Sequence, residues 1–365
     1  MPVLQKIVVK DFRNIELQEL DFSPNVNCIC GGNGQGKTNL CEAIYCLSMT
    51  KTYSGLADQY SFRYGTQGFT IAGTYLMESG LCSVFSLQAG GAGEKRIRRD
   101  DKAYSRISDH IGVLPVVMVS PADVSLVSES GEQRRRFVNS VISQTDHEYL
   151  SAVQQYNRVL MQRNRLLREG SADPLLMETF DQKLSALGRT IYDKRKAFAV
   201  EASPVVGQYY ARISGGKESV GMQYRSDLDG ANLADILSSR LERDRMLGYT
   251  GAGVQRDDFI FTMDGHQIRK CGSQGQQKSF LVALKFAQYK LMKSRYGFAP
   301  TLLLDDLFDK LDTERVSNLL QMVSGRDFGQ IFLSDTNRTR LSEIIDGITE
   351  DRAYYEAGNG VFTKL

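Results

Sequence analysis

The 365-residue sequence predicts an α/β fold in which both ends of the chain form one domain and the middle forms an inserted α-helical subdomain. Three observations predict this organisation. Short alternating apolar segments with glycine-rich turns extend to about residue 125, helical periodicity follows from about residue 129, and strand-like runs return after Asp258. We therefore expect an α/β domain over 1–128 and 251–365 and a helical subdomain over 129–250.

Most of the expected strands lie in the N-terminal part of the chain. Alternating or continuous apolar character predicts strands over 4–12, 26–30, 69–76, 82–87 and 113–119. Residues 40–49 lack Gly and Pro and predict a helix. In the C-terminal part, a helix is expected over 275–292 and buried strands over 301–304 and 330–333.

Start signals for helices mark the middle of the chain. Ser130 with Gln133, and Thr145 with Glu148, fit the capping-box pattern, in which Ser or Thr precedes Glu or Gln by three residues. Asp146 adds a favourable negative charge to the first turn of the second of these helices.

Two apolar stripes with spacings of three and four predict a pair of amphipathic helices. The stripes are Tyr149, Val153, Tyr156 and Leu160, and then Phe180, Leu184, Leu187 and Ile191. Between them, residues 170–174 break the pattern, with Asp173 suited to cap the next helix and Pro174 to its first position. The short connection predicts an antiparallel pair.

Composition limits the classes of protein to which this chain can belong. It is 42% hydrophobic and 24% charged, which predicts an ordinary core, and its net charge of +2 does not by itself indicate nucleic-acid binding. The six cysteines follow no metal-ligand spacing and are expected to be small buried residues in a reducing cytosol. No apolar run reaches the roughly 20 residues that cross a bilayer, and residues 1–6 do not resemble a secretory signal. We expect a soluble, cytoplasmic protein.

The segment Gly31-Gly32-Asn33-Gly34-Gln35-Gly36-Lys37-Thr38 has the form of a phosphate-binding loop between a strand and a helix. Its glycines let backbone N–H groups surround a polyphosphate, and the helix N-terminus faces the anion. Lys37 is expected to reach the terminal phosphates as part of the catalytic set, and the Thr38 hydroxyl to bind Mg²⁺. The predicted ATP-binding residues here are Gly31, Asn33, Gly34, Gly36, Lys37, Thr38 and Asn39.

Two carboxylates follow the apolar run Thr301–Leu304. Carboxylates at this position would lie at the C-terminal end of a buried strand, where doubly wound sheets bind their ligands. Asp305 is therefore predicted to hold Mg²⁺, and Asp306 to orient or deprotonate the attacking water. The alternative is a solvated acidic turn after a core strand.

The run Ser273-Gln274-Gly275-Gln276-Gln277-Lys278 precedes a predicted helix. A Ser and a Gly at a helix N-terminus form an anion site. Because the chain already has one phosphate loop, we expect Ser273, Gly275 and Gln276 to contact the γ-phosphate of ATP held by another subunit. The alternative is a helix cap followed by a turn.

These elements, in this order, resemble the ABC-type ATPase heads of the SMC superfamily, and more narrowly the RecF family of bacterial recombination mediators. The narrower resemblance extends over nearly the whole chain and depends on several segments with a compact helical insert. The segments are 11–14 (DFRN), 34–39 (GQGKTN), 120–123 (SPAD), 134–137 (RRRF), 162–167 (QRNRLL), 256–258 (RDD), 273–277 (SQGQQ) and 303–306 (LLDD).

The resemblance implies an ABC-type P-loop ATPase head and a weak ATPase that sandwiches ATP and Mg²⁺ between two subunits. The segment 308–312 resembles the D-loop, which adds Asp312 to the ATP site of the other subunit. It also implies binding of duplex DNA and of junctions between single- and double-stranded DNA. RecR is the implied partner, with RecO and RecA acting downstream at gaps in damaged DNA.

The chain departs from the family pattern at several positions. Gln255 stands where His precedes Arg-Asp-Asp, Lys278 stands where Arg is common, and Asp309-Lys310 replaces Ser-Glu. The place of the transporter switch histidine reads Leu333-Ser334-Asp335-Thr336, so Asp335 or Thr336 is expected to sense the γ-phosphate. The absence of the switch histidine favours slow hydrolysis of ATP.

Basic clusters are the candidate DNA contacts. They lie at 95–102, on a possible hairpin, at 134–136, at 163–168 and at 194–196. Each alone is typical of a solvated face. Two other functions stay open, an ATPase subunit of a transporter and a DNA scaffold that binds ATP without hydrolysing it. A GTPase is disfavoured because the chain lacks an N-K-x-D motif.

Overall fold

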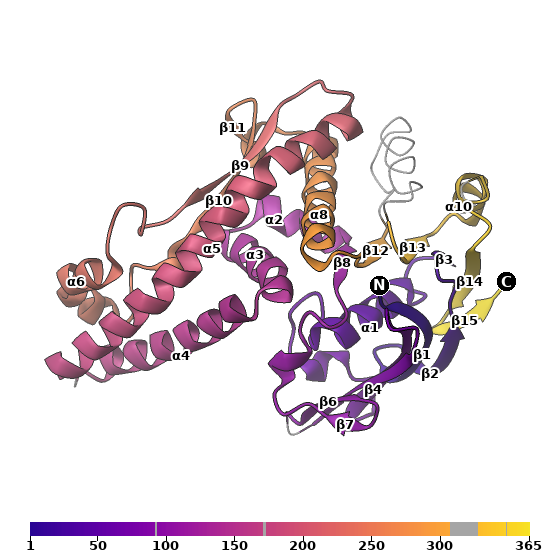
Figure 1. Cartoon of the computed structure of the whole chain (residues 1–365), viewed down its shortest axis with the longest axis horizontal. Coiled ribbons are helices and arrows are strands. Elements are labelled where there is room, and N and C mark those ends of the chain that lie inside the picture. The colour runs from indigo at the N-terminus through magenta and orange to yellow at the C-terminus, as the bar shows by residue number, and fades with distance from the viewer. Residues whose placement is uncertain (92, 171–172, 307–327, 348) are drawn as a thin grey trace. The chain divides into compact units, whose positions relative to one another are not determined.

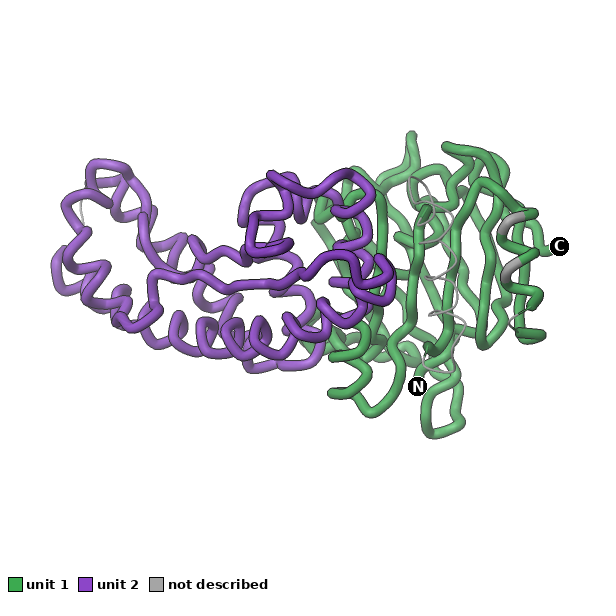
Figure 2. The backbone as a smooth tube through the Cα atoms, turned by 90° about the horizontal axis from the view of Figure 1, so that it is seen from above, with its two compact units in different colours: residues 1–123, 288–365 green, residues 124–287 purple. Residues whose placement is uncertain are grey.

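The structure is a computed structural model that describes residues 1–91, 93–170, 173–306, 328–347 and 349–365. It forms two compact units, coloured separately in Figure 2: unit 1 contains residues 1–123 and 288–365, and unit 2 contains residues 124–287. The division differs from the predicted boundaries at 128/129 and 250/251. Residues 251–287 belong to unit 2 because strand β10 (Asp258–Met263) pairs with β9 (Val220–Arg225) along its whole length.

Unit 1 contains an antiparallel sheet of six strands (Figure 1). In spatial order they are β2 (Ile15–Asp21), β1 (Val3–Phe12), β4 (Gly68–Leu76), β5 (Cys82–Gly90), β6 (Lys95–Arg99) and β7 (Lys102–Ala103). Asp100 and Asp101 have φ values of 48° and 64° and form the two-residue turn between β6 and β7. Such a turn needs positive φ at both positions, which Asp tolerates better than most residues. The basic run at 95–102 is therefore a hairpin, as the sequence suggested.

The second sheet of unit 1 is mainly parallel. In spatial order it contains β15 (Val361–Lys364), β14 (Arg352–Gly358), β3 (Val26–Cys30), β13 (Ile331–Asp335), β12 (Thr301–Asp305) and β8 (Val116–Val119). Only β15 is antiparallel to its neighbour. Strands β3, β13 and β12 are buried along their whole length. Because they pair in parallel, their carboxyl ends meet at one edge of the sheet.

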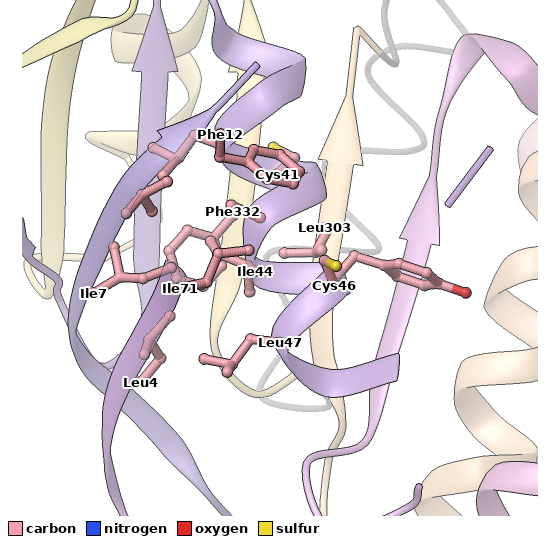
Figure 3. Packing of buried hydrophobic residues seen from close by; sticks show 14 of the residues in the cluster. Leu4, Ile7, Phe12, Cys41, Ile44, Cys46, Leu47, Ile71, Leu303 and Phe332 are labelled. Atoms are coloured by element: carbon pink, nitrogen blue, oxygen red, sulfur yellow. The ribbon is translucent and has the colours of Figure 1, made fainter. Parts of the chain in front are cut away.

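Helix α1 (Lys37–Met49) packs within the core of unit 1 and is buried along nearly its whole length. Figure 3 shows Cys41, Ile44 and Leu47 of α1 among side chains from both sheets, including Ile7 and Ile71 of the antiparallel sheet and Leu303 and Phe332 of the second sheet. Every residue of α1 from Leu40 to Met49 is buried. Its first turn is consequently fixed relative to the ends of both sheets.

Unit 2 is mainly helical. Its helices are α2 (Val124–Ser128), α3 (Gly131–Thr145), α4 (His147–Glu169), α5 (Pro174–Ser214), α6 (Leu233–Leu247) and α7 (Ile268–Cys271). Helix α8 (Gln274–Tyr296) begins in unit 2 and ends in unit 1, whose described residues also include α10 (Arg338–Ile345). A small sheet of β9, β10 and β11 (His266–Gln267) and four 3₁₀ turns, η1 (Asp58–Ser61), η2 (Ile107–His110), η3 (Pro121–Asp123) and η4 (Val254–Arg256), complete the described elements.

The predicted capping boxes were only partly correct. Ser130 is the residue before α3, but its side chain makes no capping hydrogen bond. Thr145 is the last residue of α3, and α4 is capped by Asp146, whose Oδ1 accepts from the Tyr149 amide at 2.9 Å. The Thr145 hydroxyl instead donates to the carbonyl of Ile142 within α3. A carboxylate directly before the helix is the better acceptor for its free amides.

The start of α5 and the helix pair are as predicted. Asp173 accepts from the Leu175 amide at 2.8 Å, and Pro174 is the first residue of α5. Helices α4 and α5 are antiparallel, since Arg163 bonds to Asp181 while Tyr149, near the start of α4, bonds to Arg195.

The cysteines divide into two groups. Four are buried and two are exposed, so the expectation of burial was wrong for Cys82 and Cys271. Among the helices in the described parts of the chain, none combines the length and hydropathy of a bilayer-spanning segment.

Candidate nucleotide-binding site

The predicted phosphate loop connects β3 to α1, as its sequence requires. Gly31 and Gly36 have φ values of 153° and 107° and have neighbours that exclude a side chain. A Cβ on Gly31 would lie 2.5 Å from the carbonyl oxygen of Ala357, and one on Gly36 would lie 2.9 Å from the side chain of Asn14. Only glycine fits at these two positions. Asn33 and Gly34 are exposed at the outer part of the loop.

Lys37 lies over the loop that precedes it. Its side chain is only 4% exposed, and Nζ donates to the carbonyl oxygens of Gly31 and Gly32 at 2.8 and 3.0 Å. The ammonium is therefore positioned beside the loop whose amides would surround a polyphosphate.

Thr38 and Asp305 meet, although 267 positions separate them in the sequence. The Thr38 hydroxyl donates to Oδ1 of Asp305 at 3.1 Å. Asp305 is 1% exposed, and its Oδ2 is buried without a hydrogen-bond partner among the described residues. Burial raises the pKa of the Asp305 carboxyl, which hydrogen bonds from Ser334 and Thr38 oppose. A buried carboxylate oxygen without a donor, next to a hydroxyl, fits a hard cation such as Mg²⁺.

Ser334 connects the two carboxylate residues. Its hydroxyl donates to Oδ1 of Asp305 at 2.6 Å and accepts from the backbone N–H of Asp306 at 3.1 Å. Asp306 has a φ of 45°, an unusual value for a non-glycine residue. Sequence reasoning had not assigned Ser334 a role. A local pattern could have indicated this role, because Ser334 is the first polar residue after the apolar residues 331–333 of β13.

Asp335 and Thr336 were the expected γ-phosphate sensors. Asp335 is buried at the carboxyl end of β13, where its Oδ1 accepts from the Asn337 amide at 2.7 Å. Thr336 is exposed directly after the strand.

Asn39 belongs to a polar network behind the loop. Its amide nitrogen donates to Oδ1 of Asn14 at 2.7 Å, and its Oδ1 accepts from Arg13 at 3.1 Å. Arg13 also forms an ion pair with Glu42. Burial raises the pKa of Glu42, and the Arg13 guanidinium opposes this rise. The structure thus shows Asn39 bound to the turn that follows β1.

The second predicted anion site lies in unit 2. Ser273 is exposed before α8, where its Oγ accepts from the Gln276 amide at 3.3 Å, and Oε1 of Gln276 accepts from the Ser273 amide at 2.8 Å. These reciprocal bonds are a capping box. Gly275 is half-buried in the first turn. Asp312, with the segment 308–312, lies outside the described residues.

Several predicted DNA-binding arginines are structural instead. Arg163 is fully buried and bonds to Asp181 and Asp244 at 2.6 and 2.9 Å. Arg134 pairs with Asp258, and Arg195 pairs with Asp257. These three residues are corrections to the predicted DNA surface, because a buried guanidinium held by carboxylates is not available to phosphate groups.

Other members of the basic clusters remain exposed or partly exposed. Several form ion pairs on the surface, including those of Arg136 with Glu132, Arg165 with Glu169 and Lys196 with Asp229. Exposed pairs contribute little to stability, and their cations can exchange partners. The exposed cations of the β6–β7 hairpin and its turn are Arg96, Arg99 and Lys102.

Sequence comparison finds relatives of this chain among known proteins. A family model described as RecF/RecN/SMC N terminal domain matches residues 3–59. The DNA replication and repair protein RecF of Parabacteroides distasonis is 41% identical over 358 residues, which cover 98% of both chains. The corresponding protein of Bacteroides thetaiotaomicron is 40% identical over 100% of this chain and 99% of its own.

Solved structures extend the comparison to the fold. The structure of the recombination mediator protein RecF-ATP in the RecFOR pathway superposes with a TM-score of 0.90 at 27% identity, covering 100% of this chain and 98% of that one. The Smc head domain of Pyrococcus furiosus shares the fold alone, with a TM-score of 0.58 at 13% identity over 100% of this chain and 96% of that one. The predicted fold class, an α/β ABC-type P-loop ATPase head with an inserted helical region, is confirmed.

Proposed function

Because the chain belongs to the RecF family of DNA replication and repair proteins, we propose that it is a recombination mediator that binds DNA under the control of ATP. Two subunits dimerise around ATP, bind duplex DNA and single-/double-strand junctions, and help to load a recombinase at gaps. The observation that carries this proposal is the contact between Thr38 and Asp305 beside the phosphate loop, with one Asp305 oxygen left for a cation.

The site residues of unit 1 each have a role in this proposal. The loop amides and Lys37 bind the phosphate groups of ATP. Thr38 and Asp305 would hold Mg²⁺, which, when bound, neutralises phosphate charge. Asp306 follows Asp305 directly, and its carboxylate orients or deprotonates the attacking water. Slow hydrolysis then opens the dimer and releases DNA.

The second subunit supplies the remaining contacts. We assign Ser273, Gly275, Gln276 and Asp312 of one subunit to the ATP bound by its partner. Support comes from Ser273, which is exposed directly before the 23-residue helix α8, whose N-terminus favours an anion. The Gln276 side chain holds Ser273 in place through the capping box.

The DNA contacts are assigned to exposed cations rather than to every basic cluster. Arg96, Arg99 and Lys102 on the β6–β7 hairpin are candidates in unit 1, and Arg136, Arg165 and Lys196 are candidates in unit 2. Phosphate contacts dominate such binding, so it weakens steeply with salt and reads little sequence. RecR is the proposed partner, with RecO and RecA acting downstream.

Sedimentation with ATP and Mg²⁺ tests the proposal. The wild-type chain is expected to dimerise with ATP and to bind duplex DNA more tightly in that state. Lys37→Met should lose both effects, whereas Lys183→Met, at an exposed site on α5, should keep ATP-dependent dimerisation. A wild-type chain that stays monomeric at high protein and ATP concentrations contradicts the sandwich, and normal ATP hydrolysis by Lys37→Met contradicts the site.

A further inference from the structure

Two turns of unit 1 meet at the phosphate loop. They are the β1–β2 turn at Arg13 and Asn14 and the β14–β15 turn at Asn359 and Gly360. Figure 1 shows β14 and β15, near the C-terminus, beside the N-terminal strands. The two ends of the chain therefore converge on the loop.

Gln35 of the loop is bound to the C-terminal hairpin at two points. Its side-chain Oε1 accepts from the backbone N–H of Asn359 at 2.6 Å, and its carbonyl oxygen accepts from the N–H of Gly360 at 2.9 Å. Asn359 and Gly360 have φ values of 50° and 83°, the conformation of a tight two-residue turn. Both amides of the turn consequently point at one loop residue.

The hairpin and the β1–β2 turn also make close contacts with the loop and with each other. A Cβ on Gly360 would lie 2.2 Å from the carbonyl oxygen of Asn14, and a Cβ on Gly31 would lie 2.5 Å from that of Ala357. Asn14 itself lies against Gly36. The contacts at Gly360 and Gly31 are with backbone oxygens, which have little space for adjustment, so a shift of the hairpin would be transmitted to the loop.

We propose that the β14–β15 hairpin is a clamp that holds the phosphate loop in the shape that receives ATP, and that Gln35 is the positioning residue through which it acts. The inference rests on the proposed ATP function of the loop. The hairpin contacts the loop at Gly31, through Ala357, and at Gln35, through the amides of its turn, and so limits the conformations that the loop can adopt before ATP binds. Preorganisation of this kind increases affinity because less ordering is left for the binding step.

The clamp must act in both directions. If the hairpin stabilises the loop for ATP, bound ATP must stabilise the hairpin by the same factor. The amides of Asn359 and Gly360 should therefore exchange their hydrogens more slowly when ATP is bound. A hairpin that only packs against the loop, without this coupling, would show no such change.

Gln18 provides a matched control. It too is half-buried and holds the same hairpin, since its Oε1 accepts from the Phe362 amide at 2.9 Å and its Nε2 donates to the Phe362 carbonyl at 3.3 Å. Gln18 lies on β2, however, and its side-chain bonds do not involve the loop. Replacing it removes hairpin contacts without removing the link to Gln35.

The experiment compares Gln35→Met, Gln18→Met and Gly360→Ala for ATP affinity, for steady-state hydrolysis and for hydrogen exchange of the hairpin amides. Gln35→Met should weaken ATP binding about two- to tenfold, the effect of one hydrogen bond, with KM raised and kcat nearly unchanged. Gly360→Ala, which changes a residue of the hairpin turn and leaves Gln35 intact, should weaken ATP binding in the same direction. Gln18→Met should accelerate exchange at Phe362 and leave ATP affinity as in the wild type.

Three results would overturn the clamp: unchanged affinity in Gln35→Met, a loss in Gln35→Met that Gly360→Ala does not share, or an equal loss in Gln18→Met. The second result would mean that Gln35 acts on ATP by itself. Failure of the wild-type chain to bind ATP at all would instead reject the proposed function, so the two failures are distinguishable.

Discussion

Replacing Ser334 by Ala removes the hydroxyl that connects Asp305 to Asp306. Ser334 is 1% exposed, and the variant loses both its donated bond to Asp305 and the bond that it accepts from the Asp306 amide. The side-chain volume hardly changes, so the substitution tests hydrogen bonding rather than packing. Thr38 would be the remaining donor to Asp305 among the bonds described above.

The magnitude follows from the two bonds. A hydrogen bond to a charged group contributes about 1.5–3 kcal/mol and a neutral one about 0.5–1.5 kcal/mol. The free energy of unfolding should therefore fall by about 2–4.5 kcal/mol. Groups that orient a metal ligand typically change metal affinity by about 10–100-fold. The Mg²⁺-dependent part of ATP binding should weaken by a factor in that range.

The assay is ATP binding with Mg²⁺ and with EDTA, together with urea unfolding. Ser48→Ala is the control, because Ser48 is an equally buried serine of unit 1 whose hydroxyl donates to the Leu114 carbonyl away from the carboxylates. Ser48→Ala should lose stability but keep the wild-type ratio of the two ATP affinities, and Ser334→Thr should restore part of that ratio. If Ser334→Ala also keeps the wild-type ratio of ATP affinities with Mg²⁺ and with EDTA, Ser334 does not support the cation site.

Two further predictions concern unit 2. Arg163→Met should destabilise the protein by about 3–5 kcal/mol in urea unfolding, because it leaves two buried carboxylates unpaired. Exposed Arg165→Ala should leave the free energy of unfolding nearly unchanged, and equal effects of the two variants would contradict the burial of Arg163. Asp146→Asn keeps the cap of α4 but loses the ion pair with half-exposed Lys194, so it should cost no more than about 1 kcal/mol at pH 7. Burial acts to raise the pKa of Asp146, but the bonds from Lys194 and the Tyr149 amide lower it overall. A lowered pKa contributes its full stabilisation above the unfolded value of the carboxyl and loses it as the pH falls through the folded value. The Asp–Asn difference in stability should therefore shrink progressively as the pH falls below about 4. A difference that persists or grows in acid would be inconsistent with this shift.

The nucleotide half of the site was predictable because its residues act through local sequence. A glycine run between a buried strand and a helix needs no tertiary information to be recognised, and Asp305 follows from the end of an apolar strand. The contact between Thr38 and Asp305 then follows from the parallel order β3, β13, β12, which brings the carboxyl ends together.

The C-terminal hairpin was not predictable in the same way. Its turn, Asn359-Gly360, is a local signal, but the partner of that turn is Gln35, which lies 324 positions away. The position of β14 beside β3 is a property of the whole sheet. The compact units divide the chain at other positions than the predicted domains for a related reason, because the pairing of β10 with β9 is a long-range contact that joins this part of the chain to the helical unit.

Helical periodicity separates the buried from the exposed arginines of the basic clusters. Arg163 is seven positions after Tyr156, on the continuation of the apolar stripe of α4, and Arg195 is four positions after Ile191 on that of α5. A charge on an apolar stripe must be buried with the stripe, and a buried charge needs a partner of opposite sign. Arg165 lies two residues beyond Arg163 and therefore about 200° around the helix, where it is exposed. Helical periodicity thus separates the arginines that hold the helices together from those that can meet DNA. It follows that charge reversal at Arg165 should reduce DNA affinity without a loss of stability, whereas any effect of Arg163 on DNA binding should follow its effect on folding.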